Sequence, residues 1–122
     1  MPPSIPGAHV VSAVGIDGFY GGPLDAVLRA GRRDQLLLVG LGLETTVHST
    51  MRSANDRGYE CLLVVDACAP LDPEVVPNAI SMVEMSGGIF GAVGTTNNVL
   101  AALGGDPVLA ALGGEPFRGG TS

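Results

Sequence analysis

Two uninterrupted apolar runs, separated by one segment of helix length, constrain the fold of this chain most strongly. The runs are QLLLVGL (residues 35–41) and ECLLVVD (residues 60–66). Neither alternates with polar residues, which is typical of parallel strands that are covered on both faces. Between them, Val47, Met51 and Ala54 are spaced to form one apolar face of a helix. This strand–helix–strand unit predicts an α/β fold with a site at the carboxyl end of the first run.

The rest of the chain alternates in the same way between short strands and helices. Further strands are expected at HVVSAV (residues 9–14) and IFGAV (residues 89–93), which gives a mostly parallel sheet of about four strands. Turn, capping and proline signals predict helices near residues 23–31, 44–58, 72–85 and 95–103. Pro77 leaves two alternatives for the third helix, which is either kinked there or begins there. The order of elements predicts a three-layer α/β/α sandwich.

A chain of 122 residues is long enough for one ordinary domain. Residues 1–8 are rich in proline and are expected to form a flexible lead, residues 9–103 the α/β domain, and residues 104–122 a Gly/Pro-rich tail. Two segments, LAALGGDP (100–107) and LAALGGEP (109–116), match at seven of eight positions. Eight residues are too few for the unit of a repeat protein. We interpret the two copies as a duplication of the segment that ends a helix.

Composition excludes several classes of function. Six Lys and Arg against twelve Asp and Glu give a net charge of -6, which repels a nucleic-acid backbone. Cys61 and Cys68 form neither a disulfide framework nor a paired metal motif, and no metal or other cofactor is expected. The start lacks the pattern of a signal peptide, and no run of eighteen apolar residues occurs. We therefore expect a soluble, cytoplasmic protein without a nucleic-acid or membrane partner.

The segment GLGLETTVHSTMRSANDRGY (residues 40–59) carries a resemblance to a known family. It is similar, without a gap, to the signature region of the isochorismatase-like cysteine hydrolases, in particular the branch that hydrolyses ureido and carbamoyl amides. The similarity extends over roughly residues 10–103. The resemblance implies a three-layer α/β/α fold and amide hydrolysis by a cysteine, a lysine and an aspartate.

Compared with that family, the catalytic positions are changed. The resemblance places Thr46 on the nucleophilic cysteine and Ala13 on the lysine. From the same comparison, the strand that carries the aspartate is expected to be absent, as the matched region starts about half a domain late. Glu44 matches an acidic residue of the family. The peptide between Leu41 and Gly42 matches a cis peptide, so a cis bond is expected here.

The residues themselves place a candidate ligand site at the turn after QLLLVGL. Backbone N–H groups near Glu44 to Val47 are expected to point at the mouth of the sheet, and Gly42, Glu44, Thr45 and Thr46 are the candidate ligand-binding residues. An alcohol needs a positioned base to act as a nucleophile, and Thr46 has none evident in the sequence. Thr46 is therefore interpreted as a hydroxyl at a helix end, and Glu44 as structural.

Cys68, in DACAP, is a candidate nucleophile from outside the resembled catalytic set, because it lies on the same side of the sheet. A packed thiol is the favoured interpretation. Asp66 is expected to accept loop N–H bonds rather than to act as a base.

Three functional hypotheses follow. The first is a degenerate, catalytically silent member of the family that acts in assembly or as a non-catalytic subunit. The second is an amidohydrolase for a ureido or carbamoyl amide whose site uses Thr46 or is completed by another chain. The third is a binder of small anions. Since QLLLVGL is expected to lack its neighbouring strand, either HVVSAV fills that place or the chain forms a homo-oligomer or a hetero-complex with a related subunit.

Overall fold

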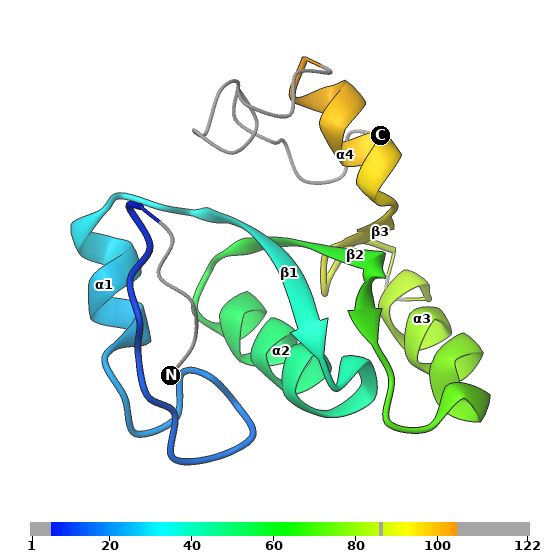
Figure 1. Cartoon of the computed structure of the whole chain (residues 1–122), viewed down its shortest axis with the longest axis horizontal. Helices are drawn as coiled ribbons and strands as arrows, with labels where there is room; N and C mark the ends of the chain where they lie inside the picture. Colours follow the sequence, from blue (N-terminus) through cyan, green and yellow to red (C-terminus); the bar gives the residue numbers. More distant parts are fainter. Residues whose placement is uncertain (1–5, 86, 105–122) are drawn as a thin grey trace.

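A computed structural model describes residues 6–85 and 87–104, so most of the expected lead (1–8) and tail (104–122) lies outside the described residues. Helices and strands alternate along the chain (Figure 1). The elements are α1 (Leu24–Ala30), β1 (Gln35–Leu41), η1 (Leu43–Val47), α2 (His48–Asp56), β2 (Glu60–Ala69), η2 (Pro73–Val75), α3 (Val76–Glu84), β3 (Ala92–Gly94) and α4 (Thr96–Ala102).

The strands form a parallel sheet in the order β1-β2-β3. Gln35 pairs with Glu60 at the start of β1, and the register shifts between Leu38 and Gly40. Beyond that irregularity Gly40 pairs with Cys68, so the ends of β1 and β2 still lie side by side. The α/β class and the parallel sheet predicted from the sequence are confirmed.

The strand predicted at residues 9–14 is wrong, and the described sheet has three strands rather than about four. Residues 9–14 have no regular structure, and the side chains of Val10 and Val14 are exposed. Valine-rich sequence favours extended backbone, but a strand requires a neighbour with which to form hydrogen bonds. Consequently HVVSAV does not fill the place beside β1, whose outer edge is unpaired within the described residues.

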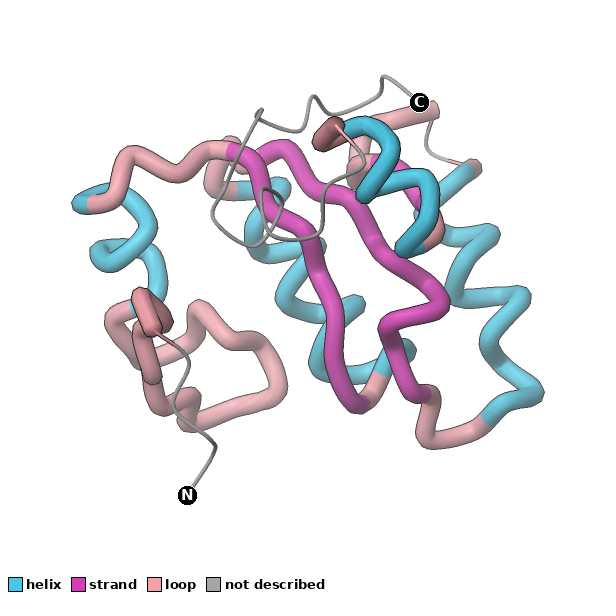
Figure 2. The backbone as a smooth tube through the Cα atoms, turned by 45° about the horizontal axis from the view of Figure 1, so that its top comes forward, coloured by secondary structure: helices cyan, strands magenta, loops and turns pink. Residues whose placement is uncertain are grey.

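Alternate residues of β2 enter two hydrophobic clusters on opposite faces of the sheet. Cys61 and Leu63 belong to a larger cluster that includes side chains of α2 and α3, whereas Leu62 and Val64 belong to a smaller one with α4. Figure 2 shows α2 and α4 on opposite sides of the strands. The larger cluster consists of Phe19, Val47, Met51, Ala54, Tyr59, Cys61, Leu63 and Val83. The layered arrangement agrees with the predicted fold class.

Local sequence signals account for most helix boundaries. The predicted apolar face of α2 is confirmed, and the chain leaves the helix through Gly58 at a φ of 91°. Asp72 caps η2 by accepting a hydrogen bond from the Glu74 N–H at 3.0 Å. Pro77 then lies in the first turn of α3, where its missing N–H costs no hydrogen bond, so α3 begins just before it.

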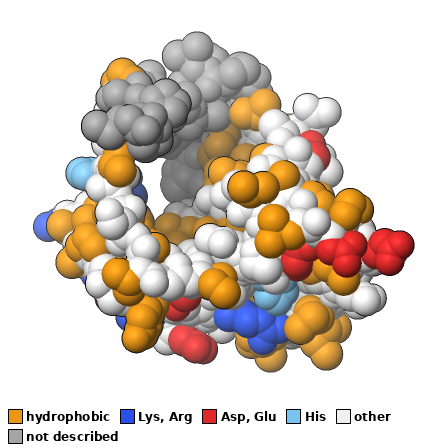
Figure 3. Space-filling view, turned by 60° about the horizontal axis from the view of Figure 1, so that its bottom comes forward, with side chains coloured by type: hydrophobic (Ala, Val, Ile, Leu, Met, Phe, Trp, Pro, Cys, Tyr) orange, Lys and Arg blue, Asp and Glu red, His pale blue; other side chains and the backbone are white. Residues whose placement is uncertain are grey.

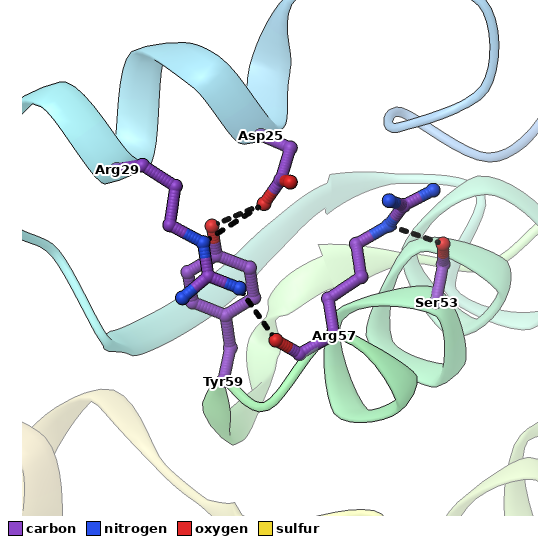
Figure 4. A network of polar contacts seen from close by, with 5 residues as sticks. All are labelled: Asp25, Arg29, Ser53, Arg57 and Tyr59. Carbon is purple, nitrogen blue, oxygen red and sulfur yellow. Dashed lines mark hydrogen bonds and ion pairs between the residues drawn. The ribbon is translucent and has the colours of Figure 1, made fainter.

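A network around Tyr59 attaches α1 to the rest of the domain (Figure 4). The Tyr59 hydroxyl donates to Asp25 Oδ1 at 2.5 Å, and the Arg29 guanidinium donates to the Arg57 carbonyl at 2.6 Å. Arg29 also lies over the Tyr59 ring, which stacks on Phe19 with 5.7 Å between ring centroids. Burial, together with the hydrogen bond to Asp25, raises the pKa of Tyr59. These contacts join segments that are more than twenty residues apart in the chain.

Replacing Tyr59 with phenylalanine is expected to lower the free energy of unfolding by about 1 kcal/mol, because Asp25 loses its hydrogen-bond donor while the stacked ring remains. Urea denaturation of both proteins measures the difference. Tyr20→Phe is the matched control, since Tyr20 is 65% exposed, and its effect should stay within about 0.5 kcal/mol. Equal effects of the two variants would contradict a structural role for the Tyr59 hydroxyl.

Candidate functional site

The turn after β1 is built around Gly42. This glycine has a left-handed backbone (φ 86°, ψ 59°), and its N–H donates to the carbonyl of Ala69, at the end of β2, at 2.7 Å. A Cβ on Gly42 would lie 2.5 Å from Thr45 Oγ1, so no larger residue fits without movement. The turn leads into η1, a five-residue π-helical segment that precedes α2. Such segments occur frequently at functional sites of helical proteins.

The expectation that backbone N–H groups from Glu44 to Val47 point at the mouth of the sheet is wrong for two of them. The Thr45 and Val47 N–H groups donate to the Gly42 carbonyl at 3.1 and 3.0 Å. The bond from Val47 is an ordinary bond within the π-helical segment, whereas the bond from Thr45 occupies one of the first-turn N–H groups that a helix start leaves free. This arrangement weakens the anion-binding hypothesis.

The expected cis peptide between Leu41 and Gly42 is also wrong. Every peptide bond among the described residues is trans, including this one. The change of chain direction is made instead by the positive φ angles of Gly40 (139°) and Gly42 (86°). Glycine accepts these angles readily, so the trans chain can leave the strand and enter the helix.

Thr46 is exposed at the start of the helix, on the side of Gly42. His48 does not serve it as a base. Burial, followed by the nearby Arg52 charge, lowers the pKa of His48, and the Ala79 carbonyl partly opposes that shift. His48 Nδ1 accepts a long hydrogen bond from Arg52 Nε at 3.4 Å, while Nε2 is buried and makes no hydrogen bond of acceptable geometry within the described part of the chain. The imidazole is therefore packed against its own helix and α3.

Glu44 holds the loop that follows β2. Its carboxylate accepts the backbone N–H groups of Leu71 at 2.9 Å and Asp72 at 2.7 Å. These two hydrogen bonds lower the pKa of Glu44. The structural role expected for Glu44 is confirmed, because both carboxylate oxygens are bound to the loop.

Cys68 and Asp66 lie beside this turn, at the end of β2, and both have structural contacts. Cys68 pairs with Gly40, and its thiol donates to the Leu38 carbonyl at 3.7 Å. Burial raises the pKa of Cys68, which disfavours the thiolate that acts as a nucleophile. Asp66 accepts hydrogen bonds from the Thr96 N–H and hydroxyl at 2.8 and 2.9 Å, which lower its pKa and fix the start of α4. Asp66 thus has the structural, N–H-accepting role expected for it, although its donor is the first residue of α4 rather than a loop residue.

The position that the resemblance assigns to the lysine is occupied by Ala13, which is exposed within the irregular segment 9–14. It offers no amine to a neighbouring group. A polar contact that the sequence did not indicate joins the loop after this segment to α2: the Gly18 N–H donates to Thr50 Oγ1 at 2.9 Å. The two residues are 32 positions apart, so no local pattern signals their contact.

Within residues 6–85 and 87–104, no group of three or more His, Cys, Asp or Glu side chains is arranged to hold a metal ion. Among the helices of the same residues, none has both the length and the apolar character needed to cross a membrane.

Comparison with known proteins identifies the family. Residues 2–98 match the isochorismatase domain family, and the chain therefore belongs to that family. The ureidoacrylate amidohydrolase of Methylobacterium radiotolerans is 34% identical over 74 residues, which cover 61% of this chain and 29% of that protein. The family assignment made from residues 40–59 is thereby confirmed.

Two solved enzyme structures have a similar fold. The N-carbamoylsarcosine amidase of Thermoplasma acidophilum superposes with a TM-score of 0.61 at 34% identity, covering 76% of this chain and 50% of the amidase. The nicotinamidase of Staphylococcus aureus gives a TM-score of 0.64 at 25% identity, covering 70% of this chain and 51% of the nicotinamidase. The chain thus spans about half the length of these two enzymes.

Replacing Glu44 with glutamine is expected to lower the hydrogen-exchange protection of the Leu71 and Asp72 amides, because a charged acceptor is lost. Since the pKa of Glu44 is lowered in the folded protein, its contribution is complete above the ordinary glutamate pKa of about 4.3 and is lost as the pH falls through the folded-state value. Acidifying the wild-type protein through this lowered folded-state pKa should therefore reproduce the effect. Glu74→Gln is the control, and equal deprotection in both variants would show that Glu44 does not hold the loop.

Proposed function

We propose that this chain is a catalytically silent member of the isochorismatase family that acts in assembly, as a non-catalytic subunit. The proposal rests on the surroundings of Thr46, which stands at the position of the family's nucleophile and has no base beside it. Thr46 is exposed, and the nearest basic side chain along its helix, His48, is packed against α3.

Physical chemistry supports a silent site. A threonine hydroxyl has a far higher pKa than a thiol, so it reacts only when a base removes its proton during attack. The carboxylate of Glu44 accepts loop N–H groups and that of Asp66 accepts the N–H at the start of α4, and both contacts favour the charged, acceptor state. Cys68, the other candidate nucleophile, has a raised pKa. None of these groups has the activation that a nucleophile or general base requires.

The alternative is an amidohydrolase whose site is completed by another chain. It is supported by the similarity to proteins that are named for hydrolysis of ureidoacrylate, N-carbamoylsarcosine and nicotinamide amides. The chain spans about half of the amidase and the nicotinamidase, and the outer edge of β1 is unpaired within the described residues. A second polypeptide that brought an acid or a base to Gly42 and Thr46 would use that edge.

The purified chain is expected to show no turnover of ureidoacrylate, N-carbamoylsarcosine or nicotinamide above that of buffer, as measured by ammonia release. Thr46→Ala and Cys68→Ala form the matched pair of variants. Turnover that disappears in Thr46→Ala but survives in Cys68→Ala would overturn the silent-site proposal and support the amidohydrolase alternative.

Assembly is proposed at the outer edge of β1, because an apolar strand with an unpaired edge is prone to pair with another chain. Leu41, at the carboxyl end of this strand, is 71% exposed. Other hydrophobic side chains are also exposed. Figure 3 shows them among polar and charged side chains on one face of the molecule.

Light scattering at low micromolar concentration is expected to give a mass larger than the 12.3 kDa of one chain, either from the chain itself or from a co-purifying partner. Leu41→Lys should reduce the mass to that of a monomer, since a lysine on an edge strand disfavours pairing. Val10→Lys, at an exposed position outside the sheet, is the control and should leave the mass unchanged. A stable wild-type monomer without a partner would contradict the assembly proposal.

A further inference from the structure

Arg52 of α2 contacts both a histidine and an aromatic ring. Its Nε donates a hydrogen bond to His48 Nδ1 at 3.4 Å, so the neutral imidazole carries its proton on Nε2. Nε2 is buried, and the Ala79 carbonyl of α3 acts on the imidazole. The guanidinium carbon of Arg52 lies 4.3 Å from the centroid of the Phe90 ring. One guanidinium therefore connects a titratable side chain to this ring.

Phe90 precedes a tightly packed entry to β3. The next residue is Gly91, where a Cβ would lie 2.9 Å from the Met51 methyl carbon of α2. Just before Phe90 in the chain, Met85 and Ile89 are 75% and 66% exposed, whereas Phe90 itself is half-buried. Phe90 thus stands between the packed backbone at Gly91 and side chains that are exposed, and the guanidinium covers one face of its ring.

Protonation of His48 is incompatible with this arrangement. The added proton occupies Nδ1, which then becomes a donor and no longer accepts from Arg52. Two positive charges then face each other in a partly buried place, where water screens them less than at an open surface. Movement of Arg52 away from the imidazole takes its guanidinium off the Phe90 ring.

Neighbouring carboxylates do not offset that repulsion. Glu44, one helical turn before His48, is bound to the loop after β2, and Glu84 of α3 is exposed. The pKa of His48 is lowered first by burial and then by the charge of Arg52, while the Ala79 carbonyl partly opposes the shift. In the described part of the chain, neither carboxylate is among the groups that shift this pKa.

We propose that the contact of His48 with Arg52 is a pH-sensitive switch, which keeps the guanidinium on Phe90 while the imidazole is neutral and releases Phe90 when the imidazole takes up a proton. Release loosens the connection between α3 and β3. It also adds the Phe90 ring to the exposed apolar side chains of Met85 and Ile89. The inference is independent of whether Thr46 is catalytically silent and of the assembly proposed at the β1 edge.

The direction of the pH response follows from the burial of His48. Because its pKa is lowered in the folded protein, the contact with Arg52 is complete above the ordinary histidine pKa of about 6.5. The contact is then lost as the pH falls through the lower folded-state value. Acid, not base, therefore releases Phe90.

Proton NMR of the full-length chain tests the switch between about pH 7.5 and about pH 4.5, a range in which ordinary aspartate and glutamate side chains remain mostly ionised. The ring current of Phe90 displaces the resonances of the Arg52 side chain. This displacement should be lost on acidification, with the same midpoint as the His48 imidazole titration. Arg57 is the matched control: it lies over Phe19 at 4.9 Å, but its Nε donates to Ser53 instead of a histidine. Its resonances should not change.

His48→Gln keeps a hydrogen-bond acceptor but does not titrate, so the Arg52 resonances should become independent of pH in this variant. The imidazole signal that disappears in the variant belongs to His48, since the chain has two histidines. If the variant does not fold, the comparison of Arg52 with Arg57 in the wild-type protein decides. Titration of His48 without a change at Arg52, equal changes at Arg52 and Arg57, or a pH response that persists in His48→Gln would each overturn the proposal.

Discussion

The packing of α2 against the parallel pair of β1 and β2 is the interaction on which the rest of the structure depends. Met51, Ala54 and Leu63 are almost completely buried where the helix meets the sheet. Gly91, just before β3, adjoins the same region: a Cβ there would lie 2.1 Å from the Cys61 carbonyl oxygen of β2 and 2.9 Å from the Met51 methyl carbon of α2. This dense packing fixes the direction of α2 and therefore the position of η1 at the sheet end.

At that end, polar groups hold the backbone in place. The Gly42 carbonyl binds the start of the helix, Glu44 binds the loop after β2, and Asp66 binds the start of α4. Each carboxylate accepts N–H groups that favour its charged form, which suits a hydrogen-bond acceptor better than a proton-transfer group. The scaffold of the family is thus maintained around a position that holds threonine.

The two faces of the sheet differ in how far they are covered. α2 and α3 contribute to a continuous cluster on one face, while α4 on the other face covers β2 and leaves the side chains of β1 exposed. The chain spans about half the length of the solved amidase and nicotinamidase that it resembles. Both observations concern β1, which has an unpaired outer edge within the described residues and exposed apolar side chains at Leu37, Val39 and Leu41.

The sequence alone determined the elements that depend on local patterns. The apolar runs at 35–41 and 60–66 gave the two long strands, and Asp72 and Thr95 cap the elements that follow them, as expected from their side-chain acceptors. The signature at 40–59 identified the family. Tertiary structure alone decided that residues 9–14 stay outside the sheet and that the Gly42 carbonyl takes up two helix N–H groups. Strand pairing and carbonyl direction depend on neighbours in space, which a local pattern does not specify.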